Sequence, residues 1–250
     1  MSPAAVPPAP PGPGGGPGAG PVPEVRRRLA LALDVPDLAA AGRLAAGVGP
    51  WFGVAKVGLE LFSAAGPAAV EHLGGMGFAV FADLKLHDIP TTVGRAARVL
   101  GRLGAAYVNF HASGGVDMLR AGVEGLAEGA RDAGHAPPVA LAVTVLTSDA
   151  DASAFDTRLR AAIDAGCGGV VCSVQEVAAV KRARADLVAV VPGVRLAGGD
   201  AHDQRRVGTP EQVARAGADL LVIGRAVTAA AEPAAAARAV HEAVARALAP

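Results

Sequence analysis

The chain has 250 residues, of which 52% are hydrophobic and 18% charged, so one large domain or two small ones can bury a sizeable core. Lys plus Arg and Asp plus Glu each number 23, and this balance argues against a nucleic-acid partner, which usually shows a basic excess. No uninterrupted run of about 18 apolar residues occurs, so neither a membrane-spanning helix nor a membrane partner is expected.

The chain begins with a stretch of Pro, Gly, Ala and Val that differs in composition from the rest. Prolines interrupt it throughout, which distinguishes it from the continuous apolar stretch of a secretory signal. We expect residues 1–25 to be a disordered tail with no role in chemistry. Cys167 and Cys172 form no C-x-x-C motif or Cys/His cluster, so we expect two reduced core thiols, as in a cytoplasmic protein.

From Arg26 onward, short apolar runs alternate with longer Ala-rich amphipathic stretches. Strands that are apolar throughout are typical of a parallel sheet covered on both faces. The predicted strands are residues 29–33, 54–58, 79–83, 107–111, 139–144, 169–172, 187–191 and 220–223. The predicted helices are residues 38–48, 64–76, 91–103, 116–133, 154–165, 174–184, 210–215 and 233–247.

This alternation predicts an α/β fold in which residues 26–250 form a single closed (β/α)8 barrel, the TIM barrel. The alternative is an open, doubly wound sheet. A dinucleotide-binding version of that sheet is disfavoured, because no G-x-G-x-x-G turn follows the first predicted strand.

Polar and charged residues recur where the predicted strands end. In a barrel of this type, the carboxyl ends of the strands form the active-site face, so these side chains are expected to share one site. They are Asp34, Lys56, Asp83, Lys85, Asn109, His111, Thr144, Thr147, Arg195, Gly224 and Arg225.

The densest group is the segment Asp83-Leu84-Lys85-Leu86-His87-Asp88-Ile89-Pro90. Asp83 and Lys85 are two positions apart, so on an extended backbone their side chains lie on the same face. A D-x-K-x-x-D run is more often a solvated loop with one ion pair. This one directly follows the apolar residues 78–82, which favours a place at the barrel mouth, near Lys56 and Asp34.

The same segment resembles the signature of the orotidine 5′-phosphate decarboxylase family. Further segments resemble the bacterial form of that family in order and spacing, and the resemblance covers about residues 29–233. They are Leu33-Asp34, Lys56-Val57-Gly58-Leu59-Glu60-Leu61-Phe62, Val108-Asn109-Phe110-His111-Ala112, Val143-Thr144-Val145-Leu146-Thr147-Ser148, Gly169-Val170-Val171-Cys172-Ser173, Pro192-Gly193-Val194-Arg195 and Val222-Ile223-Gly224-Arg225.

The resemblance implies a phosphate-binding barrel that converts orotidine 5′-phosphate to uridine 5′-phosphate in de novo pyrimidine biosynthesis, with no metal and no cofactor. It implies an alternating charged array of Lys56, Asp83, Lys85 and Asp88. In the family, the last carboxylate of this array comes from the other subunit of a homodimer. Asp88 and Thr92 are therefore expected to act across a subunit interface.

The resemblance also implies contacts with the nucleotide. Asp34 and Lys56 are expected at the ribose, Thr147 and Ser148 at the pyrimidine edge, and Gln204 between phosphate and base. The expected substrate-binding residues are Asp34, Lys56, Asp83, Ile89, Thr92, Thr147, Ser148, Arg195, Gln204, Gly224 and Arg225.

Two features of the predicted loops support phosphate capture. Gly224 lets backbone N–H groups approach a phosphate, and Arg225 can hold it with two parallel hydrogen bonds after the eighth strand. The glycine-containing residues 192–204 are expected to form a lid rather than a passive connector. The roles of His87 and His111 stay open; His111 either orients its neighbours or is a hydrogen-bonded histidine at a strand end.

The implied reaction needs a group that stabilises negative charge. Loss of carbon dioxide leaves a carbanion at C6, in the ring plane, which ring resonance cannot spread. A fixed ammonium in a water-poor site stabilises this charge and can then protonate C6, and Lys85 is the candidate. Asp83 and Asp88 would keep its amine charged. As a secondary hypothesis, Asp83 also repels the substrate carboxylate.

Two alternatives stay open. Sugar-phosphate decarboxylases and hexulose-phosphate synthases resemble this family and share the D-x-K-x-x-D run. They need a magnesium ion and a carboxylate after the second strand, where this chain has Lys56. A non-catalytic barrel that binds a phosphate ligand would not need Lys85 between two acids, and it would keep its function when Lys85 is replaced by Ala.

Overall fold

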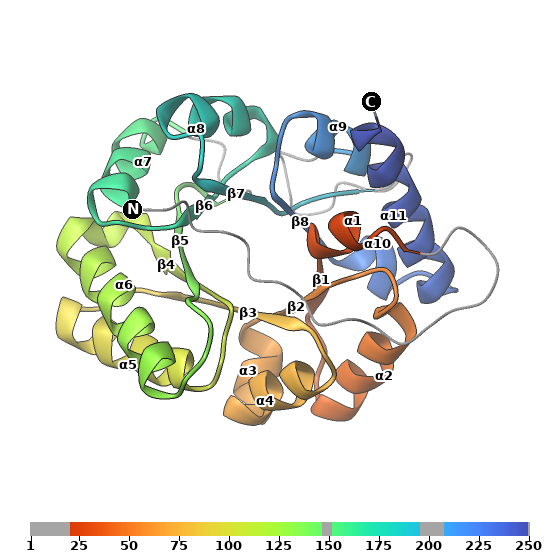
Figure 1. The fold of residues 1–250 in the computed structure, drawn as a ribbon, viewed down its shortest axis with the longest axis horizontal. Helices are drawn as coiled ribbons and strands as arrows, with labels where there is room; N and C mark the ends of the chain where they lie inside the picture. Colours follow the sequence, from red (N-terminus) through yellow and green to blue (C-terminus); the bar gives the residue numbers. More distant parts are fainter. Residues whose placement is uncertain (1–20, 147–151, 196–207, 250) are drawn as a thin grey trace.

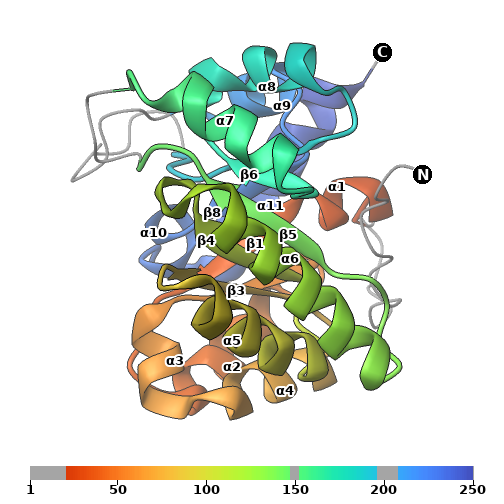
Figure 2. The same ribbon diagram turned by 90° about the vertical axis from the view of Figure 1, so that its left-hand side faces the viewer.

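The strands of the protein close into a parallel barrel. The computed structural model describes residues 21–146, 152–195 and 208–249. The strands β1 to β8 follow one another round the barrel in chain order, and β8 pairs with β1 (Figure 1). The helices surround the strands, as the perpendicular view also shows (Figure 2). The predicted (β/α)8 fold is confirmed, and an open sheet is excluded.

The strands are short and the helices between them vary in length. The strands are β1 (Leu29–Leu33), β2 (Val54–Val57), β3 (Ala79–Leu86), β4 (Tyr107–His111), β5 (Val139–Val143), β6 (Gly169–Val171), β7 (Val188–Val191) and β8 (Leu220–Ile223). The helices are α1 (Pro23–Arg27), α2 (Leu38–Val48), α3 (Leu59–Ala65), α4 (Pro67–Gly75), α5 (Pro90–Arg102), α6 (Gly115–Asp132), α7 (Phe155–Asp164), α8 (Val177–Ala183), α9 (Pro210–Arg215), α10 (Arg225–Thr228) and α11 (Pro233–Leu248), with short 3₁₀ turns η1 (Ala112–Gly114) and η2 (Val174–Glu176).

The single helix predicted for residues 64–76 is wrong. The structure has two helices there, α3 and α4, which meet at Gly66. Gly66 has φ 57°, which suits glycine, and Pro67 occupies the first turn of α4, where its missing N–H costs nothing. The Gly-Pro pair therefore ends one helix and starts the next.

The boundary predicted between tail and barrel also needs correction. Helix α1 begins at Pro23, inside the segment that was expected to be a tail. Val25 is buried, and the backbone N–H of Val22 donates to His241 Nε2 at 3.0 Å. The remainder of the expected tail, residues 1–20, lies outside the described residues.

The core has two parts, one inside the barrel and one between the strands and the surrounding helices. Phe81 and Tyr107 meet edge to face inside the barrel, with ring centroids 6.1 Å apart. Phe110 is buried in the outer layer, whereas Phe62 is only partly buried. Cys167 and Cys172 are both buried in the core, as predicted.

The helix that follows the charged motif is held very close to its neighbour. A Cβ on Gly125 of α6 would collide with the carbonyl oxygen of Gly94 on α5, and one on Gly129 would collide with that of Arg98. These glycines allow the two helix backbones to touch, so the start of α5 at Pro90 is fixed relative to the barrel.

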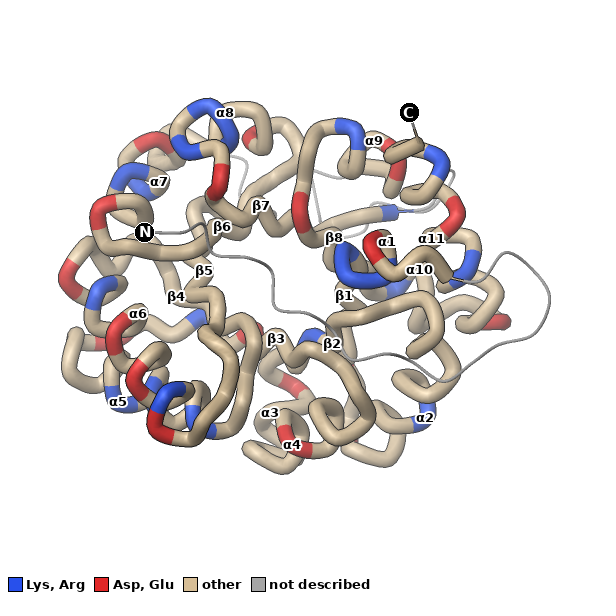
Figure 3. Tube along the Cα trace, viewed as in Figure 1, with Lys and Arg blue, Asp and Glu red and all other residues tan. Residues whose placement is uncertain are grey.

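Charges of both signs alternate round the outer helices, and neither sign covers a whole side in the view down the barrel (Figure 3). None of the helices in the described part of the chain is both long and apolar enough to cross a lipid bilayer.

Candidate active site

One cavity at the carboxyl ends of the strands collects most of the predicted site residues. Its volume is about 590 Å³, within the usual range for small-molecule sites. Its polar lining consists of Asp34, Lys56, Glu60, Asp83, Lys85, Arg195 and Arg225, and its apolar lining includes Phe81, Val143, Val171 and Val222. The parallel strands bring these residues together, as predicted from their places at strand ends.

Charges alternate in sign along one wall of the cavity. Lys85 Nζ lies 2.6 Å from Asp83 Oδ1, and Lys56 Nζ lies 3.0 Å from Asp83 Oδ2. Lys56 Nζ also lies 3.2 Å from Asp34 Oδ1. Asp83 therefore bridges two ammonium groups through its two oxygens. The two side chains of Asp83 and Lys85 lie together, as predicted.

The surroundings fix the charge states of this wall. Burial alone would raise the pKa of Asp83, but Lys56, Lys85 and hydrogen bonds from Lys85 and Asn109 outweigh it, and the pKa falls to about 2. Burial alone would lower the pKa of Lys56, but Asp83 and Asp34 raise it above its ordinary value. Asp83 is therefore an anion, and Lys56 a cation, at neutral pH.

The backbone at Lys85 is unusual. Ala82 pairs with Val108 and Leu86 with Phe110, so the register between β3 and β4 shifts between these positions. Lys85 lies within the shift and has φ 51°, the only positive φ outside glycine among the described residues. Such a conformation costs about 1–3 kcal/mol and persists where its surroundings hold it.

Asn109 holds this conformation. Its sequence position predicted a place at the shared site but no specific role there. Its Oδ1 accepts from the backbone N–H of Lys85 at 2.8 Å, and its Nδ2 donates to Asp83 Oδ1 at 2.6 Å. The available signal was an amide, both donor and acceptor, at the end of an apolar strand. Its partners could not be read from the chain, because they depend on the register shift.

Asp88, Ile89 and Thr92 lie beside the site and not in it. All three are exposed, Ile89 to 66%. Asp88 accepts a hydrogen bond from the N–H of Ile89 at 2.6 Å. Within the described part of this single chain, the ammonium of Lys85 is paired with Asp83 and not with Asp88.

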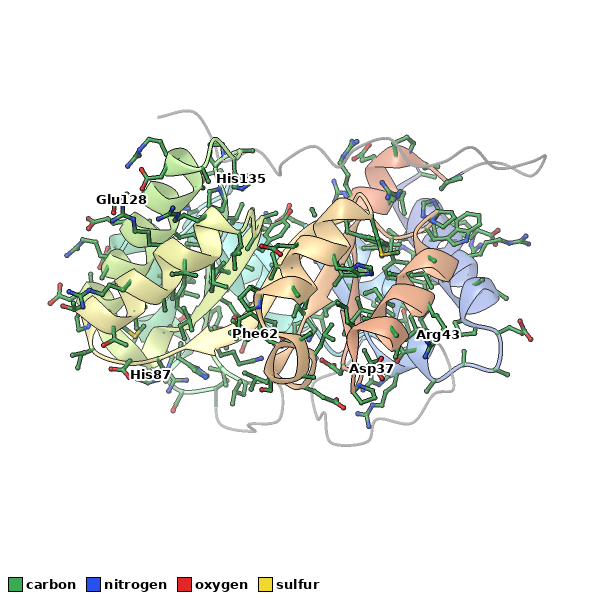
Figure 4. The ribbon with its side chains drawn as sticks, turned by 90° about the horizontal axis from the view of Figure 1, so that it is seen from below. Asp37, Arg43, Phe62, His87, Glu128 and His135 are labelled. Atoms are coloured by element: carbon green, nitrogen blue, oxygen red, sulfur yellow. The ribbon has the colours of Figure 1, made fainter. Side chains whose placement is uncertain are left out.

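Two histidines follow the charged wall. The rings of His87 and His111 lie 5.6 Å apart, centroid to centroid. Burial lowers the pKa of His111, and His87 and Lys85 lower it further. His87 lies at the same end of the barrel as Phe62 and Asp37, opposite His135 (Figure 4).

Three predicted substrate contacts, Thr147, Ser148 and Gln204, lie outside the described residues. The two ends of the predicted lid are described. Val194 forms a parallel bridge with Gly208, and the N–H of Arg195 donates to the Gly208 carbonyl at 3.0 Å. Arg195 itself lines the cavity.

Gly224 and Arg225 follow β8, which pairs with β1 in the closed barrel. The structure adds a helix that was not predicted, α10, which begins at Arg225 with Gly224 as its N-cap. Barrels of this type often bind phosphate between the loops after strands 7 and 8 and the start of a short extra helix. Both residues line the cavity.

The fold and the cavity define a class: a phosphate-binding type of (β/α)8 barrel with a lysine- and aspartate-lined site at the carboxyl ends of its strands. A family model described as "Orotidine 5′-phosphate decarboxylase / HUMPS family" matches residues 27–240. The chain belongs to this family.

Proteins named orotidine 5′-phosphate decarboxylase are similar to it along most of its length. One from Moorella thermoacetica is 48% identical over 227 residues, covering 85% of this chain and 90% of that protein. One from Anaeromyxobacter dehalogenans is 50% identical over 227 residues, covering 85% and 96%. The crystal structure of orotidine 5′-phosphate decarboxylase from Lactobacillus acidophilus matches with a TM-score of 0.75 and 32% identity, covering 86% of this chain and 98% of that one.

Proposed function

We propose that this protein is an orotidine 5′-phosphate decarboxylase, a carboxy-lyase of de novo pyrimidine biosynthesis that forms uridine 5′-phosphate and carbon dioxide. Family membership supports the reaction class. The single observation that carries the mechanism is the ammonium of Lys85, which lines the cavity and lies 2.6 Å from an ionised carboxylate.

Lys85 stabilises the charge that forms at C6. When the bond between C6 and the carboxyl group breaks, its electron pair stays on C6 and neutral carbon dioxide leaves. A fixed ammonium beside C6 lowers the energy of this carbanion more than that of the substrate, which is the requirement for catalysis. Lys85 then transfers a proton to C6, and its amine regains one from solvent, so each turnover consumes one proton. The step uses neither a metal nor a cofactor.

Asp83 has two roles in this proposal. It holds the neighbouring ammonium groups of Lys56 and Lys85 in place, because its two oxygens bind one each. It also lies where the substrate carboxylate would approach Lys85, and the repulsion between the two anions would fall as carbon dioxide leaves.

The remaining contacts orient the nucleotide. Arg225 and the N–H groups near Gly224 hold the phosphate, with Arg195 and Gln204 closing over it. Asp34 and Lys56 hold the ribose hydroxyls, and Thr147 with Ser148 holds the pyrimidine edge. Phosphate binding at one end of the cavity thus places C6 against Lys85 at the other, so binding energy is converted into orientation.

The active form in this proposal is a homodimer in the cytoplasm. Asp88 and Thr92, which lie next to Ile89 in the chain, enter the site of the partner subunit. The exposure of all three residues in the single chain supports it, since they are available to a second subunit. Asp88 would then complete the array that begins at Lys56. Cys167 and Cys172, which form no disulfide within the described part of the chain, fit a reducing compartment.

The magnesium-dependent chemistry considered for related barrels fits this site less well. The ammonium of Lys56 lies between the carboxylates of Asp34 and Asp83, at 3.2 and 3.0 Å. A divalent cation would need those same oxygens and would be repelled by Lys56.

A direct assay tests the proposal. Purified protein is incubated with orotidine 5′-phosphate and a chelator, without added cofactor, and the ultraviolet absorbance change to uridine 5′-phosphate is followed. Turnover under these conditions is expected. A folded protein that leaves the substrate unchanged, or acts on a hexulose phosphate with added magnesium, would contradict it.

A further inference from the structure

Asn109 is a buried amide between the two central residues of the site. It is 1% exposed, and β4 places it against the carboxyl end of β3. Its Oδ1 accepts from the N–H of Lys85, and its Nδ2 donates to Asp83 Oδ1. The reverse orientation of the amide would set its oxygen against the carboxylate and its NH₂ against the N–H. One side chain therefore holds both the backbone of Lys85 and the carboxylate of Asp83.

The place of Asn109 in the sheet explains why an amide is useful there. Ala82 pairs with Val108 and Leu86 with Phe110, so Asn109 alone stands opposite the three residues of β3 that lie between. The N–H of Lys85 reaches the side-chain oxygen of Asn109 at 2.8 Å. That bond fixes the left-handed backbone at Lys85, and with it the direction in which the side chain leaves the strand.

Asn109 also donates a hydrogen bond to Asp83 after Lys85 has given its proton to the substrate and is neutral. Asp83 Oδ1 accepts from both Lys85 Nζ and Asn109 Nδ2, each at 2.6 Å. Transfer of a proton from Lys85 weakens the first donor, but the amide donor does not titrate. Asp83 is thereby held ionised through the step and can draw a proton from solvent back to the amine.

We propose that Asn109 is a positioning residue for decarboxylation, whose amide aims the ammonium of Lys85 into the cavity and supplies Asp83 with a second, permanent donor. The inference rests on the proposed function. Asn109 is not among the residues that line the cavity, so it acts through Lys85 and Asp83 rather than on the substrate.

Two variants and a matched control test this role. Asn109→Ala removes the donor and the acceptor. Asn109→Asp keeps an acceptor for the N–H of Lys85 but sets a second carboxyl group against Asp83. Tyr107→Phe is the control: Tyr107 is equally buried, two residues earlier on the same strand, and the replacement keeps the ring that packs against Phe81.

For Asn109→Ala, kcat is expected to fall about 100-fold, the size of effect that a misplacement of about 1 Å produces. The Kd for uridine 5′-phosphate, measured by calorimetry, should change less than about threefold, since ribose and phosphate contacts remain. In a crystal structure of this variant, φ of Lys85 should leave the positive region.

For Asn109→Asp, the ratio of variant to wild-type kcat is expected to rise as pH is lowered from about 8 to 5. Facing carboxyl groups share a proton, and the protonated group can donate to Asp83 as the amide does. For Tyr107→Phe, that ratio should stay flat with pH.

The outcomes separate the two proposals. An inactive wild-type protein overturns the proposed function. An active wild-type protein whose Asn109→Ala variant has the kcat of Tyr107→Phe, or keeps φ of Lys85 positive, overturns the role of Asn109 alone. A flat pH ratio for Asn109→Asp also overturns it.

Discussion

Two lysine–aspartate pairs with the same separation lie at opposite ends of the barrel. At the carboxyl ends of the strands, Lys85 Nζ lies 2.6 Å from Asp83; at the amino ends, Lys181 Nζ lies 2.6 Å from Asp219. Both lysine side chains are about equally exposed. Distance and exposure therefore do not distinguish a pair that performs chemistry from one that holds the fold together.

The other hydrogen bonds of the two lysines distinguish them. Lys181 also donates to the carbonyl oxygens of Leu187 and Ala185, at 2.9 and 3.5 Å, and Asp219 also accepts from the N–H of Ala189 at 2.7 Å. The three ammonium protons of Lys181 therefore all have acceptors on the protein.

Lys85 instead lines a cavity from a strained backbone, and its carboxylate partner is shared with a second ammonium. A lysine whose protons point into a cavity can act on a ligand, whereas one whose protons are all bound within the protein can only stabilise the fold. The difference predicts that removing the first affects rate and removing the second affects stability.

The largest expected effect is that of Lys85→Ala on turnover. Removing one donor aimed at the transition state costs about 3–4 kcal/mol, and Lys85 also supplies the proton, so kcat should fall at least about 1,000-fold. The free energy of unfolding should change by less than about 1 kcal/mol, because Asp83 keeps Lys56 as a partner. Steady-state kinetics and urea unfolding measure the two, and Lys181→Ala is the matched control. Equal kcat for the two variants would contradict the comparison.

The second largest expected effect is on the stability of the protein at low pH, through Asp83 at the carboxyl ends of the strands. The pKa of Asp83 is lowered to about 2 in the folded protein, below the ordinary value that it regains on unfolding. Its stabilisation is therefore complete above about pH 4 and is lost as pH falls toward 2; it amounts to about 2 kcal/mol. The free energy of unfolding, measured at successive pH values between about 4 and 2, should fall less for Asp83→Asn than for the wild type. A loss for Asp83→Asn as steep as that of the wild type would contradict this assignment.

The contrast between the two ends also shows how far sequence reasoning reached. The bounds of β1, β4 and β8 were predicted as observed. All residues of β1 and β8 are apolar, and β4 is apolar apart from Asn109 and His111. The proximity of Asp83 and Lys85 was also predicted, but from alternation along an extended strand, whereas Lys85 has φ 51°. The strand bounds depend on local sequence, whereas the conformation of Lys85 also depends on Asn109.

The features that were missed depend on neighbours distant in sequence. The role of Asn109 follows from a register shift between β3 and β4, which alternation along one strand does not reveal. Helix α10 is too short for its periodicity to show. Asp88 makes no described pair with Lys85 in one chain, so its predicted place in the array depends on a second subunit.

At the amino end, the expected effect of Lys181→Met is on stability. It removes the ion pair and two further hydrogen bonds and leaves Asp219, which is 29% exposed, without its ammonium. The free energy of unfolding should fall by about 1–2 kcal/mol, and kcat should be unchanged. The exposed Arg182 on the same helix provides the control, since Arg182→Ala makes the same change in charge. A loss of kcat without a loss of stability would show that the two ends are not separable in this way.

The smallest expected effect is on the pH dependence of stability and concerns His241, whose hydrogen bonds connect α11 to Val22 and Trp51. Its Nε2 accepts from the N–H of Val22 at 3.0 Å, so Nδ1 carries the proton and donates to the Trp51 carbonyl at 3.3 Å. Burial lowers the pKa of His241, although the Trp51 carbonyl and Glu242 act in the opposite direction. The neutral ring is therefore favoured by folding, and this stabilisation is present above about pH 6.5 and lost as pH falls below it.

His241→Gln should keep both hydrogen bonds without titrating. We expect it to lose less stability than the wild type between about pH 7 and 5, by no more than about 1 kcal/mol. His135→Gln is the control, because His135 is exposed and binds only the Arg102 carbonyl among the hydrogen bonds described for it. Thermal unfolding across this range measures the difference. If the two variants lose stability in parallel, protonation of His241 does not contribute to the loss of stability at low pH. The pH dependence of the free energy of unfolding would then arise at the carboxyl end of the barrel, around Asp83.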